Sequence, residues 1–484
     1  MFQLIVAFFF PFVYAFLLSL KDFPHLTIRG ALIDLLLKNC KVAFLEGISE
    51  VCLGIDRGKI TCIGFESSMP EADRTIDLEG KVVVPGAVDA HVHVFSPGWI
   101  RETFETGTKA AAVGGVTTIA DMSSVGEWQT VNVETFRKKL ERAEKEAVVD
   151  FSLYCGEIYK KEDLKEIPEI LRLGAVGLGE IMMCEPDPIP DSMVLLEAMR
   201  IASKERTFIA LHAEDKEIIQ KNVELMRKRG RQDLEAFTES RPAIAESKAV
   251  LDAAILSSEA NCPVHICHLS SEKGVEALRT AKKISRVTAE TTPHHLLLSS
   301  KDYEKLGPLM VATPPVREKN DLLALWEGLS SGLIDAMASD HCAFSRREKE
   351  EAESIWSVPP GIPGLETMMP LLWSEGVRKG RISLRRFIEA TSLRPAQILG
   401  IYPRKGTIAF GYDADLAVID QKARWRIGKE DMVCIADYTP FDGYEVHGRI
   451  VMTIVRGEIV AEEGSILAKP GYGNFIPRKF FSES

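Results

Sequence analysis

The strongest constraint on the fold is an alternation of eight short apolar runs with helical stretches through the middle of the chain. The runs occupy residues 82–92, 115–122, 149–156, 175–183, 207–214, 262–270, 286–295 and 333–341. Helical stretches lie between most of them, at 132–147, 191–205, 245–260 and 272–284 among others. Eight strand–helix units over roughly 300 residues predict an α/β fold, a (β/α)8 TIM-type barrel with insertions.

The two ends of the chain are β-rich and differ from this middle part. Residues 34–84 contain short apolar strands separated by Gly and Asp-Arg-Gly turns. Residues 406–464 show the same pattern of short strands and turns. We therefore expect a small β-sandwich domain built from both chain ends, residues 25–85 and 404–462. The barrel would occupy residues 86–403, and residues 463–484 would form a C-terminal tail.

The first residues of the chain form a separate apolar segment. Residues 2–20 carry no charge and are about long enough to span a bilayer. They lack the basic region and the small-residue cleavage site of a signal peptide. Two interpretations of residues 1–24 stay open, a membrane anchor or an extension from a mis-assigned start, and we favour the second.

The overall charge and the cysteine pattern limit the partners and the compartment. The chain has 59 basic and 70 acidic residues, a net charge of −11, which argues against nucleic acid and acidic membrane surfaces as partners. Its nine cysteines include no CxxC pair and indicate reduced thiols. We expect a cytoplasmic protein that acts on a small molecule, forms a dimer or a tetramer, and contacts a membrane only if residues 2–20 are an anchor.

Residue types that bind metal ions lie at the C-terminal ends of the predicted barrel strands, where the chemistry of this fold is located. They are His91 and His93 in the first strand, Glu180 in the fourth, His212 in the fifth, His268 in the sixth and Asp340 in the eighth. Each residue alone has an ordinary explanation as a surface, core or turn residue. Together they predict a metal centre with nitrogen and oxygen ligands, which suits zinc and also Mn, Fe, Co or Ni.

Glu180 is the most demanding of these residues. It is the only charged residue in the run GAVGLGEIMM, residues 174–183. A buried carboxylate costs several kcal/mol unless it is paired, hydrogen-bonded or bound to a metal. A metal centre would supply the partner that Glu180 needs.

Several segments resemble the amidohydrolase superfamily, and within it the cyclic-amidase branch of allantoinase, dihydroorotase, hydantoinase and dihydropyrimidinase. The matching text includes VVVPGAVDAHVHV, VHICHLSSEKGVEAL, ETTPHHLLL and LIDAMASDHC, and the resemblance extends from about residue 34 to residue 460. It implies a centre of two divalent ions, expected to be zinc. His91, His93 and Asp340 would bind the more buried ion, and His212 and His268 the second.

The bridging ligand is where this chain departs from the resemblance. Relatives bridge the two ions with a carboxylated lysine on the fourth strand, whereas the matching residues 174–180 contain no lysine. A one-residue bulge would bring Glu180 to that position, and without the bulge Gly179 would take it. Glu157, at the end of the third strand, is the alternative carboxylate, and a centre with one ion is a further alternative.

The resemblance also implies residue roles and a reaction. Asp340 would be the catalytic base, with His294 and Thr313 on the substrate side, and the reaction would be hydrolysis of a C–N bond in a cyclic amide. Dihydroorotase relatives hold the ring carboxylate with an arginine two residues after the second ligand histidine, and here that residue is Phe95. This residue argues against dihydroorotase, and the text HVHVFSPG followed by FETGTKAAAVGGVTT most resembles allantoinase. We expect an allantoinase-like enzyme, with dihydroorotase or hydantoinase/dihydropyrimidinase as alternatives.

A hypothesis of another class is a non-catalytic, dihydropyrimidinase-like scaffold. The missing lysine favours it, and the retention of four histidines and Asp340 opposes it.

Overall fold

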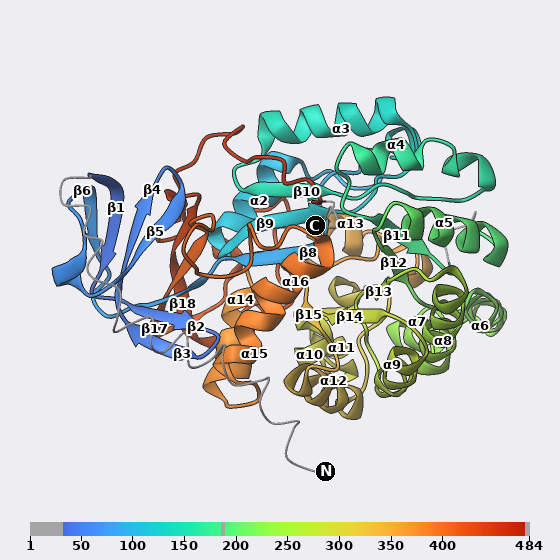
Figure 1. Ribbon diagram of the computed structural model, residues 1–484. Helices are drawn as coiled ribbons and strands as arrows, with labels where there is room; N and C mark the ends of the chain where they lie inside the picture. The colour runs from blue at the N-terminus through green and yellow to red at the C-terminus, as the bar shows by residue number, and fades with distance from the viewer. Residues whose placement is uncertain (1–31, 185–188, 480–484) are drawn as a thin grey trace, which may run out of the picture.

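The structure is a computed structural model that describes residues 32–184 and 189–479, and it consists of a barrel with a β-sandwich beside it (Figure 1). The apolar segment 1–24 lies outside the described residues. No helix in the described part of the chain is long and apolar enough to cross a membrane.

The barrel contains eight parallel strand positions that correspond to the eight apolar runs. Its strands are β8 (Ala87–His93), β9 (Val116–Asp121), β10 (Asp150–Leu153), β11 (Leu178–Met182), β12 (Ile209–His212), β13 (Val264–Ile266), β14 (Val287–Thr291) and, from the eighth run, β15 (Ala336–Met337) and β16 (His341–Cys342). Two sheets, β10-β9-β8-β16 and β11-β12-β13-β14-β15, make up the wall. A bridge between Cys155 and Leu178 joins β10 to β11, so the ring closes and the predicted barrel is confirmed.

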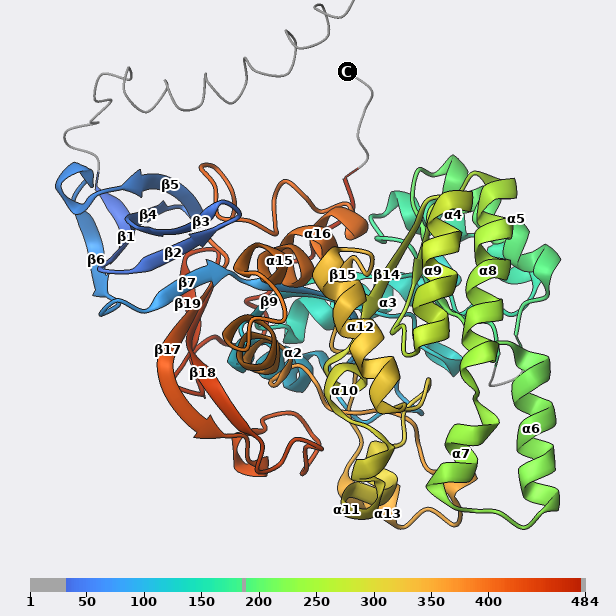
Figure 2. The same cartoon turned by 90° about the horizontal axis from the view of Figure 1, so that it is seen from below.

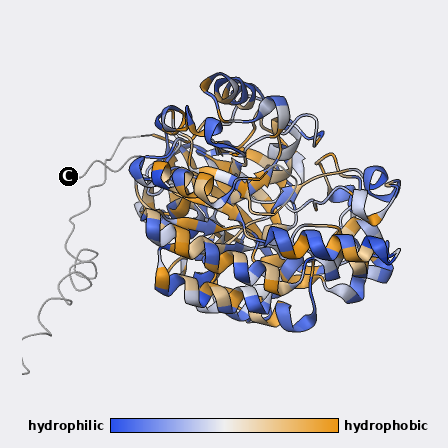
Figure 3. Ribbon diagram, turned by 90° about the vertical axis from the view of Figure 1, so that its right-hand side faces the viewer, coloured by the Kyte–Doolittle hydropathy of each residue, from blue (hydrophilic) through white to orange (hydrophobic). Residues whose placement is uncertain are grey.

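Helices surround the strands, with hydrophobic residues gathered in the interior of the molecule (Figure 3). They are α2 (Phe104–Val113), α3 (Val133–Glu146), α4 (Ile167–Arg172), α5 (Ser192–Lys204), α6 (Lys216–Lys228), α7 (Leu234–Ser240), α8 (Ala243–Ala260), α9 (Glu272–Ile284), α10 (Pro293–Leu297), α11 (Tyr303–Leu306), α12 (Lys319–Ser331), α13 (Arg346–Glu350), α14 (Met368–Leu371), α15 (Leu384–Ile388) and α16 (Arg394–Leu399). Side-chain caps begin several of them. The Asn132 side chain accepts a hydrogen bond from the Thr135 amide at 2.8 Å at the start of α3, as favoured N-cap residues do.

The β-sandwich is built from both chain ends, as predicted. One sheet has the order β5-β4-β1-β6, from β1 (Ile33–Lys38), β4 (Cys52–Asp56), β5 (Lys59–Gly64) and β6 (Ala72–Asp77). The other has the order β20-β19-β18-β17-β7-β2-β3, from β2 (Lys41–Phe44), β3 (Gly47–Glu50), β7 (Val82–Pro85), β17 (Leu416–Arg426), β18 (Glu445–Val455), β19 (Glu458–Glu462) and β20 (Ser465–Ile466). Apolar side chains of both sheets, including Leu37, Leu53 and Val418, form one buried cluster. Figure 2 shows β7 beside β2 and β17, the two strands with which it pairs.

The apolar run at 82–92 supplies strands to both domains. It divides at Gly86, because β7 pairs with β17 in the sandwich and β8 pairs with β9 in the barrel. A Cβ on Gly86 would lie 2.2 Å from Cγ2 of Thr117, which is why the chain needs glycine where it passes from one domain to the other.

Small and large side chains of the barrel strands pack together in one buried cluster. It combines Ala90, Ala120 and Ala210 with Tyr154, and Leu399 of α16 belongs to the same cluster. Strand β8 shifts its register against β9 between Asp89 and Val92. Such an irregularity changes the direction in which side chains point, and it lies next to the histidines at the end of β8.

The C-terminal residues return to the barrel after β20. The Phe151 amide of β10 donates to the Asn474 carbonyl at 3.0 Å, and the Ile476 amide donates to the Phe151 carbonyl at 2.7 Å. Residues 474–476 of the predicted tail therefore run alongside β10, and Phe475 forms a parallel bridge with Phe151. Strand β20, also within the predicted tail, belongs to the sandwich sheet.

A buried charged cluster joins the barrel to the sandwich. Lys405 Nζ lies 2.5 Å from an oxygen of Asp150, 2.5 Å from an oxygen of Asp415 and 3.0 Å from an oxygen of Asp413, and the Lys405 side chain is 1% exposed. Asp150 begins β10, whereas Asp413 and Asp415 precede β17. The barrel thus contributes one carboxylate and the segment before β17 contributes two, and Lys405 contacts all three. Arg456 also pairs with Asp150, and Arg404 with Asp413.

Replacing this lysine should weaken the whole fold. Lys405→Met leaves buried carboxylates without their central cation, so we expect the free energy of unfolding to fall by about 3–5 kcal/mol. The control is Lys59→Met, because Lys59 contacts Asp413 from a side chain that is 42% exposed and should cost less than about 1 kcal/mol. Urea unfolding followed by circular dichroism measures both, and equal losses would contradict the role given to burial.

Candidate metal centre and active site

Glu180 lies in β11 with its side chain at the centre of the barrel mouth. The pairing of β11 with β12 shifts register between Leu178 and Ile181, so the segment contains a bulge. Leu178 and Ile181 pack into the main hydrophobic cluster, whereas the Glu180 carboxylate lies among histidines. The two carboxylate oxygens face two different groups of side chains.

The first group surrounds Oε2 of Glu180. His91 Nε2 lies 3.6 Å and His93 Nε2 lies 3.8 Å from this oxygen. The same two nitrogens are 3.1 Å apart and lie 3.3 and 3.6 Å from Oδ1 of Asp340. Four donor atoms from three barrel strand positions therefore converge on one point.

The second group surrounds Oε1 of Glu180. His268 Nε2 lies 2.8 Å and His212 Nδ1 lies 3.6 Å from it, and the two nitrogens are 3.1 Å apart. Within the described residues this group has three donor atoms, one fewer than the first. The carboxylate of Glu180 is shared between the groups, and all six metal ligands predicted from the sequence lie in one or both of them.

The backbone is strained at two of these positions. His268 has φ 31° and Asp340 has φ 48°, in the left-handed region that non-glycine residues rarely adopt. Such conformations cost about 1–3 kcal/mol each and persist where the surrounding structure enforces them, often at functional sites.

Two further buried glutamates contact the ring nitrogens of His91 and His212 that face away from Glu180. Neither glutamate was predicted from the sequence. Glu290 Oε1 lies 2.6 Å from His91 Nδ1, and Glu214 Oε2 lies 2.8 Å from His212 Nε2. Glu214 also pairs with the guanidinium of Arg241. The signal available in the sequence was the one used for Glu180, a carboxylate inside or directly after an apolar strand.

The two predicted substrate-side residues lie in different environments. His294 is 1% exposed, and no described residue forms a hydrogen bond with its Nε2. Burial, followed by the neighbouring His295 and His268, lowers the pKa of His294 well below its usual range, so the ring is neutral. Thr313 is half-buried and precedes Pro314, whose carbonyl contacts Nε2 of His295 at 3.0 Å.

Phe95 is part of an aromatic cluster beside the first histidines. Its ring stacks on Phe104 at 5.2 Å and meets Trp128 edge-on at 4.9 Å. Arg101 points elsewhere, because its side chain is 76% exposed and pairs with Glu348 at 3.0 Å. The position at which the resemblance implies an arginine for dihydroorotase is therefore in an aromatic, apolar environment here.

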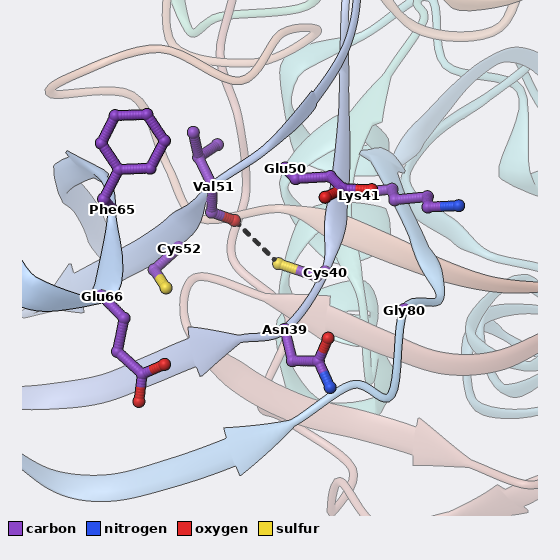
Figure 4. A pocket seen from close by; sticks show the side chains of 9 residues that line it. All are labelled: Asn39, Cys40, Lys41, Glu50, Val51, Cys52, Phe65, Glu66 and Gly80. Atoms are coloured by element: carbon purple, nitrogen blue, oxygen red, sulfur yellow. Dashed lines mark hydrogen bonds between the residues drawn. The ribbon is translucent and has the colours of Figure 1, made fainter.

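The sandwich contains a separate hollow of about 240 Å³ lined by residues that include Cys40, Cys52 and Glu66 (Figure 4). Cys40 Sγ donates to the Val51 carbonyl at 3.2 Å. Burial raises the pKa of the Cys40 thiol to about 12, which keeps it protonated and poorly nucleophilic. The nine cysteines form no disulfide.

Comparison with known proteins agrees with this architecture. The model of the amidohydrolase family matches residues 82–460. The chain belongs to the amidohydrolase family.

The chain is 36% identical to the L-hydantoinase of Paenarthrobacter aurescens, over 93% of this chain and 99% of that one. It is 34% identical to the dihydroorotase of Methanosarcina mazei, over 92% and 98%. The solved structure of the L-hydantoinase from Arthrobacter aurescens matches with a TM-score of 0.87 and 36% identity, covering 92% of this chain and all of that one. The superfamily resemblance is thus confirmed.

The donor sets of this amidohydrolase fit divalent metal ions, on which this family of hydantoinases depends. Two ligands held about 2.0–2.1 Å from a tetrahedral zinc ion lie roughly 3.3 Å apart. The donor atoms around Glu180 Oε2 are 3.1–3.8 Å apart. Burial would lower the pKa of His91, but acidic neighbours including Glu180 and Asp340 outweigh it and raise that pKa well above its usual range. The neighbouring His93 shifts the other way, since burial and the charge of His91 lower the pKa of His93 to about 3.

Glu157, the alternative bridging carboxylate of the amidohydrolase, lies outside both donor sets. It is 7% exposed, accepts a hydrogen bond from the Tyr159 hydroxyl at 3.0 Å and contacts Ser123 Oγ at 3.4 Å. Burial, with a smaller contribution from the charge of Glu180, raises the pKa of Glu157 to about 7.

This elevated pKa predicts a pH-dependent effect of Glu157→Gln. The protonated acid stabilises the fold below the unfolded pKa of 4.5, and that contribution is lost as the pH rises through about 7. The amide does not ionise, so the variant should gain stability relative to the parent as the pH rises from 5 to 8, on the order of 1–3 kcal/mol. Urea unfolding at both pH values measures this gain, with the surface variant Glu162→Gln as the control. Loss of bound metal in Glu157→Gln would instead support Glu157 as the bridge.

Proposed function

We propose that this amidohydrolase opens a neutral cyclic ureide or amide ring at a centre of two divalent metal ions bridged by Glu180. The observation that carries the proposal is the division of the Glu180 carboxylate between two sets of donors. Relatives named hydantoinase and dihydroorotase support hydrolysis of a C–N bond in a cyclic amide. Zinc is the expected ion, and the dimer or tetramer stays a prediction.

The ligand roles follow from the donor atoms. His91, His93 and Asp340 would hold one ion with Glu180 Oε2, and His212 and His268 the other with Glu180 Oε1. Bound divalent ions supply Lewis acidity, which makes water nucleophilic near neutral pH and polarises a carbonyl. The second set has one protein donor fewer, and catalytic sites keep such an open position for the substrate.

Asp340 is the group best suited to move a proton. Burial raises the pKa of Asp340 above its usual value, although His91 and His268 oppose the shift. A base whose pKa lies closer to the working pH transfers protons more efficiently. Asp340 would accept the proton of the attacking water on a carboxylate oxygen and deliver it to the leaving ring nitrogen. His294 would hydrogen-bond the substrate through Nε2, which has no hydrogen-bond partner among the described residues.

A neutral ring is favoured because the position of Phe95 offers no cation. A ring carboxylate taken out of water needs a fixed positive partner, which arginine supplies with two charge-assisted hydrogen bonds. Phe95 packs against aromatic rings instead, and Arg101 pairs with Glu348. Hydantoins are the first candidates, given the hydantoinase relatives, followed by dihydropyrimidines and allantoin. Dihydroorotate is the alternative substrate to these neutral rings, because relatives of similar identity are dihydroorotases.

Removal of the bridging charge should abolish the centre. Glu180→Gln is expected to lose at least about 99% of kcat/KM and to hold less than two equivalents of zinc, because the amide cannot supply two anionic donor atoms. Glu157→Gln is the matched control and should keep both ions. Since no carboxylated lysine is required, activity of the parent protein should not change when bicarbonate is removed. Normal turnover and two ions in Glu180→Gln would refute the assignment, and a parent protein with little metal would favour the scaffold hypothesis.

Substrate preference tests the role of Phe95. We expect kcat/KM for hydantoin, dihydrouracil or allantoin to exceed that for dihydroorotate by roughly a thousandfold, since an unpaired buried carboxylate costs several kcal/mol. All rings should be compared on the same metal-loaded preparation. Arg101→Gln tests whether Arg101 binds the ring carboxylate in place of the missing arginine. A fall in kcat/KM for dihydroorotate alone would show that it does. Efficient dihydroorotate turnover with poor turnover of the neutral rings would overturn the preference.

A further inference from the structure

Each half of the centre contains one histidine whose outer nitrogen contacts a buried glutamate. His91 Nδ1 faces Glu290 Oε1 at 2.6 Å, which leaves the lone pair of Nε2 directed at His93, Asp340 and Glu180. The side chains of His91 and Glu290 are both 0% exposed. The hydrogen bond therefore selects the tautomer that can donate to a metal ion.

The second half uses the opposite tautomer. His212 Nε2 faces Glu214 Oε2 at 2.8 Å, and Nδ1 is directed at His268 and Glu180. Two histidines thus present different ring nitrogens to the centre, and in each case a glutamate carboxylate accounts for the choice.

The two glutamates differ in what else they contact. The other oxygen of Glu290 meets His265 Nε2 at 3.0 Å, and His265 Nδ1 contacts Thr288 Oγ1 at 2.9 Å. Glu214 contacts the guanidinium of Arg241 through the same oxygen that faces His212. The charge of Glu214 is therefore neutralised locally by a cation, whereas Glu290 shares its charge between two imidazoles.

We propose that Glu290 and Glu214 are positioning residues that set the tautomers of His91 and His212, and that Glu290 makes its half of the centre the tighter metal site. A carboxylate behind a histidine increases electron donation by the ligand nitrogen, and loss of such partners weakens metal affinity 10–100-fold. An arginine on the carboxylate reduces that effect for Glu214. The inference rests on the two-ion centre proposed above.

The test is zinc affinity of the metal-free full-length protein, measured by competition with a chromogenic chelator. The parent protein should bind two zinc ions in two steps. Glu290→Gln keeps the shape and removes the charge, and it should weaken the tighter step about 10–100-fold. Glu214→Gln should weaken the other step only a few-fold and leave the tighter step unchanged.

A third buried glutamate provides the matched control. Glu102 Oε2 contacts His341 Nε2 at 2.7 Å, and both side chains are 0% exposed. His341 is not in either donor set, because its Nδ1 accepts hydrogen bonds from the amides of Gly364 and Leu365. Glu102→Gln should therefore leave both zinc affinities within twofold of the parent values, while it removes an equally buried carboxylate–histidine contact.

Further variants separate positioning from folding. If Glu290→Gln does not fold, Glu290→Asp retains the charge at a longer distance and should weaken the tighter step less than tenfold. His265→Gln leaves Glu290 against His91 and should have a smaller effect than Glu290→Gln. Unchanged affinities in Glu290→Gln, or a larger loss in Glu214→Gln, would overturn this inference alone. Fewer than two zinc ions in the parent protein would refute the proposed centre itself.

Discussion

A carboxylate at the centre of a closed barrel is the constraint on which the functional region depends. Glu180 lies among apolar strand residues, where an uncompensated negative charge would be very unfavourable. Its oxygens are stabilised by four histidine nitrogens, and the bulge in β11 directs the side chain toward them. The strained backbone of His268 and Asp340 is consistent with the same requirement, since both residues lie where loops must turn donors inward.

The two halves of this arrangement are unequal. One side of Glu180 meets three other protein donors, and the other side meets two. Closed coordination by protein favours retention of an ion, whereas incomplete coordination leaves room for an exchangeable ligand. The asymmetry extends to the glutamates behind the histidines, because Arg241 contacts Glu214 and imidazoles contact Glu290. This asymmetry is the basis for the proposal that one half holds its ion more tightly and the other engages the substrate.

Much of the fold could be predicted because its signals are local. The apolar runs, their regular separation and the β-rich chain ends indicated the barrel and the sandwich. The side chains at strand ends indicated the centre. Strand register could not be predicted, since the shift between Leu178 and Ile181 depends on pairing with β12, a strand contributed by another part of the chain. The contact of Glu290 with His91 could not be predicted for the same reason, because these residues meet only when the barrel closes. For Phe95 the missing cation was predictable, but its packing against Phe104 and Trp128 was not.

The sandwich strand β7 has a consequence for the order in which the chain can fold during synthesis. Residues 82–85 pair with β17 at 416–426, so this edge of β7 stays unpaired until nearly the whole chain has left the ribosome. All the candidate metal donors, from His91 to Asp340, are synthesised before that partner. Unpaired apolar edges recruit other chains, and long-range pairing lengthens the time for which they are exposed. A nascent chain that stops after the barrel would contain the complete centre and would still be prone to aggregate.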